Sequence, residues 1–256
     1  MQDLELSVIS LRSAEERRRY MIRQLEMFKL PWSLFDALTG DAPPIPYSQA
    51  EAAIDWRGPL TAGEIGCFAS HYACLAEFVA QNTARYRLVI EDDVQLDSGF
   101  WFDRLPGLMD ATGLDYLRLC AKFPFRHRVV AVFGQRFIVR YSSGPLGTQA
   151  YVISQRGAQQ FLKSVDRITR PVDWELDRYW HNGLPPYTLC PFPLFEMERT
   201  STVPKIRGAE FRASGMQWLR RQVRRNLERA KREAASLALL PRDRQVRDSI
   251  LAWWKN

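Results

Sequence analysis

Three consecutive carboxylates, Glu91, Asp92 and Asp93, have the clearest potential for chemistry in this chain. They follow the aliphatic run 88–90, which predicts a buried strand of an α/β sheet. Because side chains alternate along a strand, Glu91 and Asp93 are expected on one side and Asp92 on the other. Clustered carboxylates repel one another, so they need a cation or exposure to water. Their oxygens suit Mg²⁺ or Mn²⁺, which commonly bind through carboxylates and substrate phosphates.

A solvated acidic turn is the alternative interpretation of this triplet, because runs of charge are usually solvated surface. The buried strand that precedes the triplet favours a functional site instead. Open α/β sheets bind their ligands at the carboxyl ends of strands, where these three residues are expected.

The first 37 residues predict a strand–helix–strand unit that would position such a site. Residues 6–11 and 32–37 are expected to be strands, and Pro31 ends the helix between them. The helix is expected to follow Ser13, which would form a capping box with Glu16. A unit of this length is typical of nucleotide-binding α/β proteins.

Polar residues fall at the ends of both predicted strands. Ser10, Arg12 and Asp36 would lie there, with ordinary turn and capping roles as the alternative. After them, residues 41–60 contain four prolines and are expected to form a surface loop.

Thr61 and Glu64 form a second capping box, which predicts a helix to about residue 80. The capping box gives Glu64 a complete structural role. No equally complete structural role is predicted for Ser70 and His71. The stripe of Cys67, His71 and Cys74 could suggest zinc. A structural zinc site needs four ligands, however, and nothing nearby supplies the fourth.

The second half of the chain alternates strands and helices. A hairpin is predicted from residues 129–133 and 137–141, then a loop over 142–149 and a strand over 150–153. Ser154 is expected to cap the next helix, and Asp173 to occupy another N-cap position. Residues 182–207 are rich in proline and are expected to be irregular.

Composition limits the class of protein. The 256 residues, 46% of them hydrophobic, suffice for one good-sized core or one domain with an appendage. The four cysteines lack CxxC spacing, and the N-terminus lacks the basic and apolar stretches of an export signal. With no apolar run long enough to span a membrane, we expect free thiols and a cytoplasmic location.

The positive charge is concentrated near the C-terminus. Residues 1–216 contain 25 basic and 25 acidic side chains, whereas residues 217–247 contain 10 and 3. The core is therefore not expected to bind nucleic acid. Residues 216–240 predict an arginine-rich amphipathic helix, and a shorter amphipathic segment carries Val246, Ile250, Trp253 and Trp254. We expect two parts, a catalytic domain over 1–207 and a basic helical extension over 208–256.

Taken together, these motifs resemble glycosyltransferase family 25, which includes bacterial lipopolysaccharide and lipooligosaccharide glycosyltransferases and collagen galactosyltransferases. The matching segments are 8–13 with Arg17 and Arg18, 35–37, 60–67 with Ser70 and His71, 88–94, 147–153 and 171–173. The resemblance implies a GT-A-type fold, with a mixed, mostly parallel sheet and an acidic metal motif. It also implies inverting transfer of a hexose, often galactose, from a UDP-sugar to a lipooligosaccharide or related glycan.

The resemblance also suggests roles for individual residues. The predicted ligands of Mn²⁺ or Mg²⁺ are Asp93 and Glu91. The predicted donor-binding residues are Ser10, Arg12, Arg17, Asp36, Glu64, Ser70, His71 and Asp92. The acceptor hydroxyl needs a general base, for which Asp173 is the candidate, with Glu175 and Asp177 behind it.

Two other functions remain open. A metal-dependent phosphoryl-transfer enzyme could use the same carboxylates, although the chain has neither a P-loop nor a second dense acidic cluster. A non-enzymatic protein could bind its partner through the basic extension. For that extension we expect contact with an anionic membrane, at the inner face of the inner membrane, or packing on the catalytic domain or a second subunit.

Overall fold

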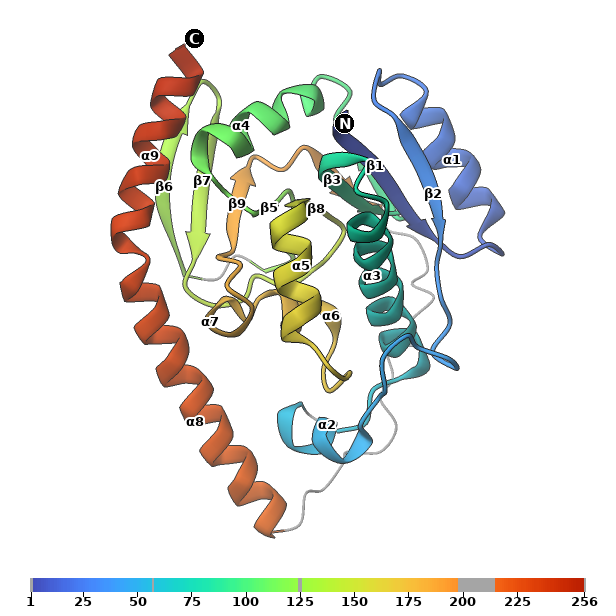
Figure 1. Ribbon diagram of the computed structural model, residues 1–256, viewed down its shortest axis with the longest axis vertical. Coiled ribbons are helices and arrows are strands. Elements are labelled where there is room, and N and C mark those ends of the chain that lie inside the picture. The colour runs from blue at the N-terminus through green and yellow to red at the C-terminus, as the bar shows by residue number, and fades with distance from the viewer. Residues whose placement is uncertain (1, 57, 124–125, 198–214, 256) are drawn as a thin grey trace.

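The computed structural model describes residues 2–56, 58–123, 126–197 and 215–255 (Figure 1). Its strands are β1 (Gln2–Ser10), β2 (Trp32–Asp36), β3 (Ala84–Glu91), β4 (Val94–Leu96), β5 (Tyr116–Arg118), β6 (His127–Phe133), β7 (Arg136–Tyr141), β8 (Ala150–Ser154), β9 (Tyr187–Cys190) and β10 (Leu194–Glu196). Its helices are α1 (Glu15–Leu25), α2 (Gln49–Asp55), α3 (Ala62–Gln81), η1 (Phe102–Arg104), α4 (Leu105–Thr112), α5 (Gln155–Ser164), α6 (Val172–Leu176), α7 (Tyr179–Asn182), α8 (Gly215–Ala238) and α9 (Leu240–Lys255).

A mixed eight-stranded sheet forms the centre of the molecule, in the order β2-β1-β3-β8-β5-β9-β7-β6. Strands β1, β2 and β3 pair in parallel, and β5 pairs in parallel with β9. Only β7 and β8 run against the other six strands of this sheet. The predicted mixed, mostly parallel α/β sheet is confirmed in this sense. Strands β4 and β10 form a separate antiparallel pair.

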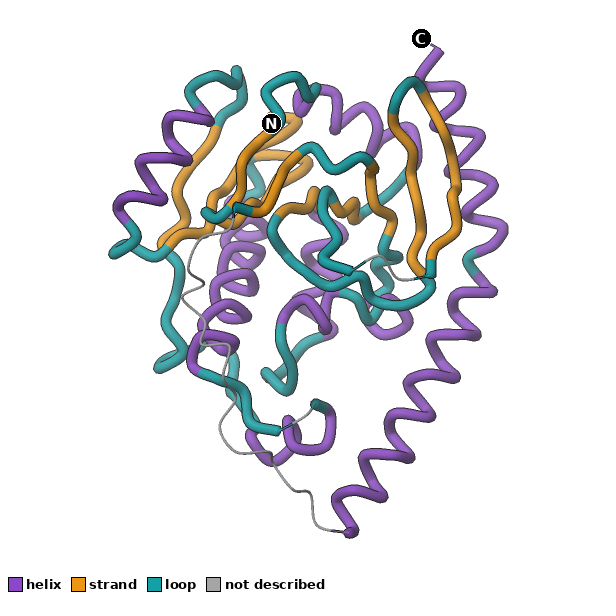
Figure 2. The backbone as a smooth tube through the Cα atoms, turned by 180° about the vertical axis from the view of Figure 1, so that it is seen from behind, coloured by secondary structure: helices purple, strands orange, loops and turns teal. Residues whose placement is uncertain are grey.

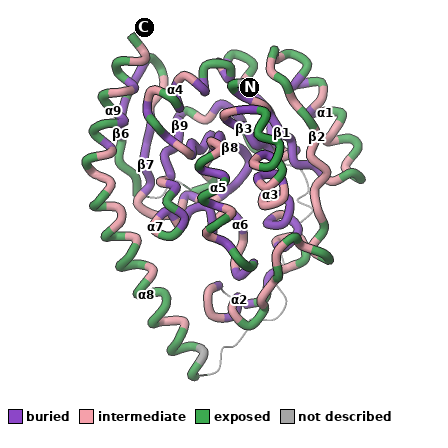
Figure 3. Tube along the Cα trace, in the orientation of Figure 1, coloured by how far each residue is buried: buried purple, intermediate pink, exposed green. Residues whose placement is uncertain are grey.

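Hydrophobic cores cover both faces of the sheet. On β3, Leu88 and Ile90 belong to one core and Val89 to the other, and none of the three is exposed. The alternation follows from the pleat of the strand. One core includes residues of α1, α4 and α9, whereas α3 and α5 supply the other. Figure 2 shows the molecule from behind, and Figure 3 shows the buried strands between the more exposed helices.

The two C-terminal helices run along one edge of the molecule (Figure 1). Helix α9 packs against β6 and α4, and α8 continues past the sheet toward α7 and α2. The division at residues 207 and 208 stays a prediction, and residues 208–214 lie outside the described residues. Pro241, which directly follows the predicted helix over 216–240, lies in the first turn of α9, where proline is well tolerated.

Several local predictions are confirmed. Thr61 and Glu64 form the expected capping box, and Ser154 Oγ accepts a hydrogen bond from Gly157 N–H at 3.0 Å. The predicted hairpin is formed by β6 and β7.

Other local predictions are wrong. The capping box of Ser13 and Glu16 does not form, because a turn bonds Ala14 N–H to Leu11 O and makes Ala14 the N-cap. The cap of α6 is Pro171, so Asp173 lies within its first turn.

Two irregular predictions also need correction. The predicted loop 41–60 contains α2, which Ser48 caps, because the four prolines lie before or after the helix and none lies within it. The predicted irregular segment contains β9 and β10, since its prolines flank these short strands. Residues 198–207 of that segment lie outside the described residues.

Candidate active site

A cavity of about 330 Å³ opens where the carboxyl ends of β1 and β3 meet the N-terminal half of α3. Glu91, Asp92 and Asp93 all line it, as predicted for the end of a buried strand. The other predicted site residues that line it are Ser10, Arg17, Ser70 and His71. Its volume is in the range of small-molecule sites.

Glu91 is held by residues from two other elements. It accepts a short hydrogen bond from Thr148 Oγ1, and its Oε1 lies 3.3 Å from His71 Nε2. The other ring nitrogen, His71 Nδ1, lies 3.0 Å from the hydroxyl of Tyr151. Burial acts to raise the pKa of Glu91, but His71 and Thr148 outweigh it and lower that pKa. The side chain of Glu91 is therefore ionised although it is largely buried.

Asp92 points toward the first strand–helix unit. Ser10 Oγ donates to Asp92 Oδ2 at 2.5 Å, and Arg17 Nη1 lies 3.2 Å from Asp92 Oδ1. Burial raises the pKa of Asp92 despite both partners. Ser10, Arg17 and Asp92 thus form one linked group on the wall of the cavity.

Asp93 has an unsatisfied oxygen. Among the described residues, its buried Oδ1 has no hydrogen-bond partner. Burial, followed by the charges of Glu91 and Glu196, raises the pKa of Asp93 to about 7. A buried carboxylate oxygen without a donor is costly unless something compensates its charge. A divalent cation would do so, and the residues around Asp93 fit one in charge and ligand type.

A second set of possible ligands lies beside it. Cys67, His71 and Glu91 each offer one ligand atom, and these atoms lie within 4.8 Å of one another. Burial, with the charges of Glu91, Asp173 and Asp93, raises the pKa of the Cys67 thiol well above its usual value. Cys74 lies elsewhere, beside Arg87, so zinc on the stripe of α3 is not supported.

Asp173 lies behind the loop that carries Thr148. Its Oδ2 accepts from Gly147 N–H at 3.3 Å, and its Oδ1 accepts from Trp174 N–H at 2.9 Å. Burial raises the pKa of Asp173, and the charge of Glu91 adds to this effect. The loop therefore connects Asp173 to the acidic cavity, although Asp173 is not part of the cavity wall.

A buried arginine that the sequence analysis assigned no role fixes this loop. Arg118 donates to the carbonyl of Leu146 at 2.7 Å and makes shorter hydrogen bonds to Gly147 O and Asp177 Oδ1. Leu146 has a φ of 59°, which is rare for a residue with a branched side chain. Such strain persists only where surrounding contacts enforce it, and Arg118 supplies those contacts.

Three of the predicted donor-binding residues do not line the cavity. Arg12 pairs with Asp36 at 2.5 Å on the surface, and Asp36 also pairs with Arg18 at 2.5 Å. The hydrogen bonds of Arg18 and then Arg12 lower the pKa of Asp36. The third, Glu64, accepts from Thr61 N–H at 2.8 Å within the capping box.

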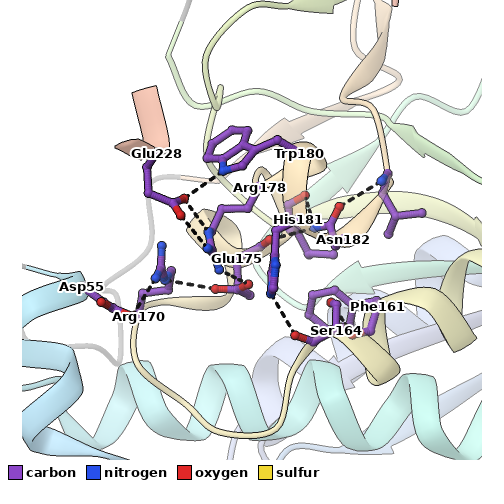
Figure 4. A network of polar contacts seen from close by, with 12 residues as sticks. Asp55, Phe161, Ser164, Arg170, Glu175, Arg178, Trp180, His181, Asn182 and Glu228 are labelled. Atoms are coloured by element: carbon purple, nitrogen blue, oxygen red, sulfur yellow. Dashed lines mark hydrogen bonds and ion pairs between the residues drawn. The ribbon is translucent and has the colours of Figure 1, made fainter. Parts of the chain in front are cut away.

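Glu175 is not brought to the acidic cavity. Its carboxylate is buried between Arg170 at 3.0 Å and Arg178 at 2.8 Å (Figure 4). Asp177 accepts from Arg118 and from Leu146 N–H, so it supports the loop. Asp173 and Asp177 both contact the loop, and the charge of Glu91 raises the pKa of Asp173.

The geometry places an acidic, partly desolvated cavity at the strand ends of a mixed, mostly parallel sheet. The sequence profile of glycosyltransferase family 25 (LPS biosynthesis protein) matches residues 4–176, which include Glu91, Asp92, Asp93 and Asp173. The chain belongs to glycosyltransferase family 25. The family-level prediction is therefore confirmed.

Relatives of this family 25 chain occur in animals and bacteria. It is 32% identical over 178 residues to procollagen galactosyltransferase 1 of Danio rerio, covering 62% of this chain and 28% of the relative. It is also 32% identical over 185 residues to a human protein named inactive glycosyltransferase 25 family member 3, covering 66% and 30%. A putative glycosyltransferase of Haemophilus influenzae is 26% identical, with 66% of this chain and 60% of the relative covered. The chain thus spans less than a third of these animal relatives.

Proposed function

We propose that this chain is an inverting, metal-dependent hexosyltransferase. It would transfer galactose from UDP-galactose to a lipopolysaccharide, lipooligosaccharide or related glycan acceptor. The observation that carries the proposal is the unsatisfied Oδ1 of Asp93 in the cavity at the ends of β1 and β3. A sheet of this kind with carboxylates at that edge also supports a GT-A-type arrangement.

Asp93, with Glu91 beside it, would hold Mn²⁺ or Mg²⁺. The bound ion would stabilise the charge that develops on the leaving diphosphate. Arg17, whose side chain is only 17% exposed, supplies a further positive charge to the same wall. Ser10 and Asp92 offer polar groups to the ribose, and Ser70 and His71 complete the donor side of the cavity. Arg12, Asp36 and Glu64 lie farther out, so their roles in donor binding depend on the position of the donor.

Asp173 is the proposed general base. Two backbone N–H groups fix its carboxylate, and its raised pKa makes it a better proton acceptor than an exposed aspartate. It would remove the proton from the acceptor hydroxyl as that oxygen attacks the sugar. Attack on the face opposite the diphosphate inverts the configuration of the transferred sugar.

Asp93→Asn tests the metal and the reaction together. The wild-type protein is expected to transfer hexose from UDP-galactose to truncated lipooligosaccharide in Mn²⁺ and to stop in EDTA. Asp93→Asn should lose transfer and the Mn²⁺-dependent rise in Tm with UDP, while it keeps its fold. Transfer by wild-type protein in EDTA would overturn the metal claim, and release of UDP without a glycan product would favour a hydrolase.

Asp173→Asn should slow transfer by about 10²–10⁴-fold, the usual contribution of a general base. The affinity for UDP should be unchanged, because Asp173 does not line the donor cavity. A wild-type rate would remove Asp173 from the reaction, and weaker UDP binding would assign it to the donor site.

A separate observation supports contact between α8 and an anionic membrane. The exposed fractions are 51% for Leu219, 60% for Val223, 51% for Leu227 and 68% for Leu237, so this apolar stripe faces away from the protein. Residues 216, 219, 223, 227, 230, 234 and 237 keep to one line along the helix.

Basic side chains flank the stripe. Arg220 and Lys231 are exposed, and neither has a partner among the described residues. Each could contribute about 1 kcal/mol near anionic headgroups. No helix within the described part of the chain is long and apolar enough to cross a membrane.

Flotation with anionic liposomes tests this contact. Val223→Asp should reduce flotation, whereas Val132→Asp should not, because Val132 is an equally exposed valine (61%) on β6. Equal flotation of the two variants would show that the apolar stripe does not contact the membrane. A wild-type protein that stays unbound at low salt would show the same. Concentration-dependent dimerisation that Val223→Asp abolishes would identify a second copy of the chain as the occupant instead.

A further inference from the structure

A second, larger cavity lies between α8 and the elements α2, α6 and α7. Its volume is about 660 Å³, and we call it the basic cleft. Seven arginines line it against three carboxylates, which are Asp55, Asp177 and Glu228. Trp56, Trp174 and Trp180 also contribute to its walls.

Part of this positive charge is already neutralised. Figure 4 shows Arg170 between Asp55 and Glu175, and Arg178 between Glu175 and Glu228. These ion pairs connect the wall of the basic cleft to α8.

The remaining arginines leave a positive excess. Arg225 lines the basic cleft and has no partner among the described residues. Arg232 lies over the ring of Trp180 at 5.9 Å, and among the described residues Arg229 forms an ion pair with Glu233 alone, on its own helix. An anionic ligand would find unpaired guanidinium donors here, which suit phosphate and carboxylate groups.

The loop 144–148 connects the basic cleft to the acidic cavity, because Gly144 lines the cleft and Thr148 binds a carboxylate that lines the cavity. Thr148 binds Glu91 in the acidic cavity, whereas two residues earlier Leu146 N–H donates to Asp177 at 2.9 Å on the cleft side. The loop passes so close to Asp177 that a Cβ atom on Gly144 would lie 2.6 Å from Asp177 Oδ2. Asp173 and Trp174 are consecutive, and Trp174 lines the basic cleft.

We propose that the basic cleft binds the anionic part of the acceptor, a saccharide that carries phosphate or carboxylate groups. The arginines would bind the anionic groups, and the tryptophans would offer flat apolar surfaces to the sugar rings. This proposal rests on the proposed transferase function, because the cleft adjoins Asp173. A nucleic acid is the less suitable ligand, since Asp55, Asp177 and Glu228 would repel a continuous phosphate backbone.

The first experiment measures binding without catalysis. Titration calorimetry on the full chain would compare oligosaccharides that are identical except for a phosphate group, a carboxylate group or neither. The charged versions should bind more tightly than the neutral one, and Arg225→Ala should weaken them by about tenfold, the value of one charge-assisted hydrogen bond. Arg220→Ala is the matched control, because Arg220 is an exposed arginine of the same helix that does not line the basic cleft.

The second experiment separates acceptor from donor. In the transfer assay without lipid, Arg225→Ala should raise KM for the charged acceptor by about tenfold and leave KM for the UDP-sugar unchanged. Arg225→Lys should recover part of the loss, and both variants should keep the wild-type Tm. If charged saccharides bind but no sugar is transferred, the proposed transferase function is wrong. The proposal that the basic cleft binds anionic saccharides would then still hold.

Three results would overturn the proposal for the basic cleft. Equal binding of charged and neutral saccharides would remove the anionic specificity. A higher KM for the UDP-sugar in Arg225→Ala would make the cleft a donor site. Competition by single-stranded RNA at physiological salt, lost in Arg225→Ala, would make it a nucleic-acid site.

Discussion

Helices α8 and α9 are similar in sequence character and opposite in placement. Both are amphipathic and basic, and residue 239 joins them. In α9, Val246 and Ile250 are completely buried, and Trp254 packs on Phe133 with ring centroids 5.3 Å apart. In α8 the apolar stripe is exposed, and the polar face is turned toward the protein.

The charged partners on the domain explain the reversal. Arg224 of α8 pairs with Asp55, and Glu228 accepts from Arg178 at 3.0 Å and from Trp180 Nε1–H at 2.8 Å. A hydrophobic surface of β6 and α4 receives α9 instead. The period of an amphipathic helix identifies its apolar face, but the surface opposite the helix decides which face is buried.

The largest effect is expected where α9 is anchored by charge. Asp243 accepts from Arg140 at 2.6 and 2.8 Å and from the hydroxyl of Tyr187 at 2.9 Å, and all of these groups are buried. Asp243→Ala leaves the buried guanidinium of Arg140 without its carboxylate partner, so it should lower the free energy of unfolding by about 3–5 kcal/mol. Urea denaturation measures this loss. Asp248→Ala is the control, because Asp248 is exposed and should change stability by less than about 0.5 kcal/mol.

The next effect compares the two apolar faces directly. Ile250→Ala in α9 removes a completely buried side chain and should lower the free energy of unfolding by about 2–5 kcal/mol. Leu227→Ala in α8 should change it by less than about 0.5 kcal/mol, because Leu227 is 51% exposed. Similar losses for the two variants, measured in urea, would show that the stripe of α8 is covered in solution.

The smallest effect concerns the contact of α8 with the domain. Burial acts to raise the pKa of Glu228, but the hydrogen bond and charge of Arg178 outweigh it and lower that pKa. The contribution of Glu228 is therefore complete above its ordinary value of 4.5 and is lost as the pH falls through the lowered pKa. It should amount to about 1 kcal/mol, the net value of a hydrogen bond.

Hydrogen-exchange protection in α8 reports this contact. Protection should decrease in acid for the wild-type protein, while Glu228→Gln should already have lower protection at neutral pH and little further change. Equal protection of α9 in both proteins serves as the internal control. A wild-type level of protection in Glu228→Gln would mean that other contacts hold α8 in place.

The sequence predicts best what depends on neighbours along the chain. The run 88–90 identifies the buried strand, and the triplet after it lines the cavity because strand ends meet there. The capping box of Thr61 and Glu64 is equally local. These features need no knowledge of the tertiary structure.

Long-range contacts explain what the sequence could not predict. Arg118 lies in a strand, and its partners Asp177 and Gly147 are 59 and 29 residues away, so no local pattern marks it. Glu175 is two residues from Asp173, and that spacing turns it about 200° around the helix, away from Asp173. Closeness in sequence therefore suggested a shared site that the helix geometry prevents.

Helix α8 separates the apolar stripe from the basic cleft by its own thickness, since the two occupy opposite sides of one helix. A helix with its side chains is about 10–12 Å across. If the stripe rests on a bilayer, the basic cleft stands about one helix diameter above the headgroups. The distance between an acceptor sugar and the lipid would then decide whether the enzyme can use it. Sugars close to the lipid could be modified, whereas those at the far end of a long glycan would be out of reach.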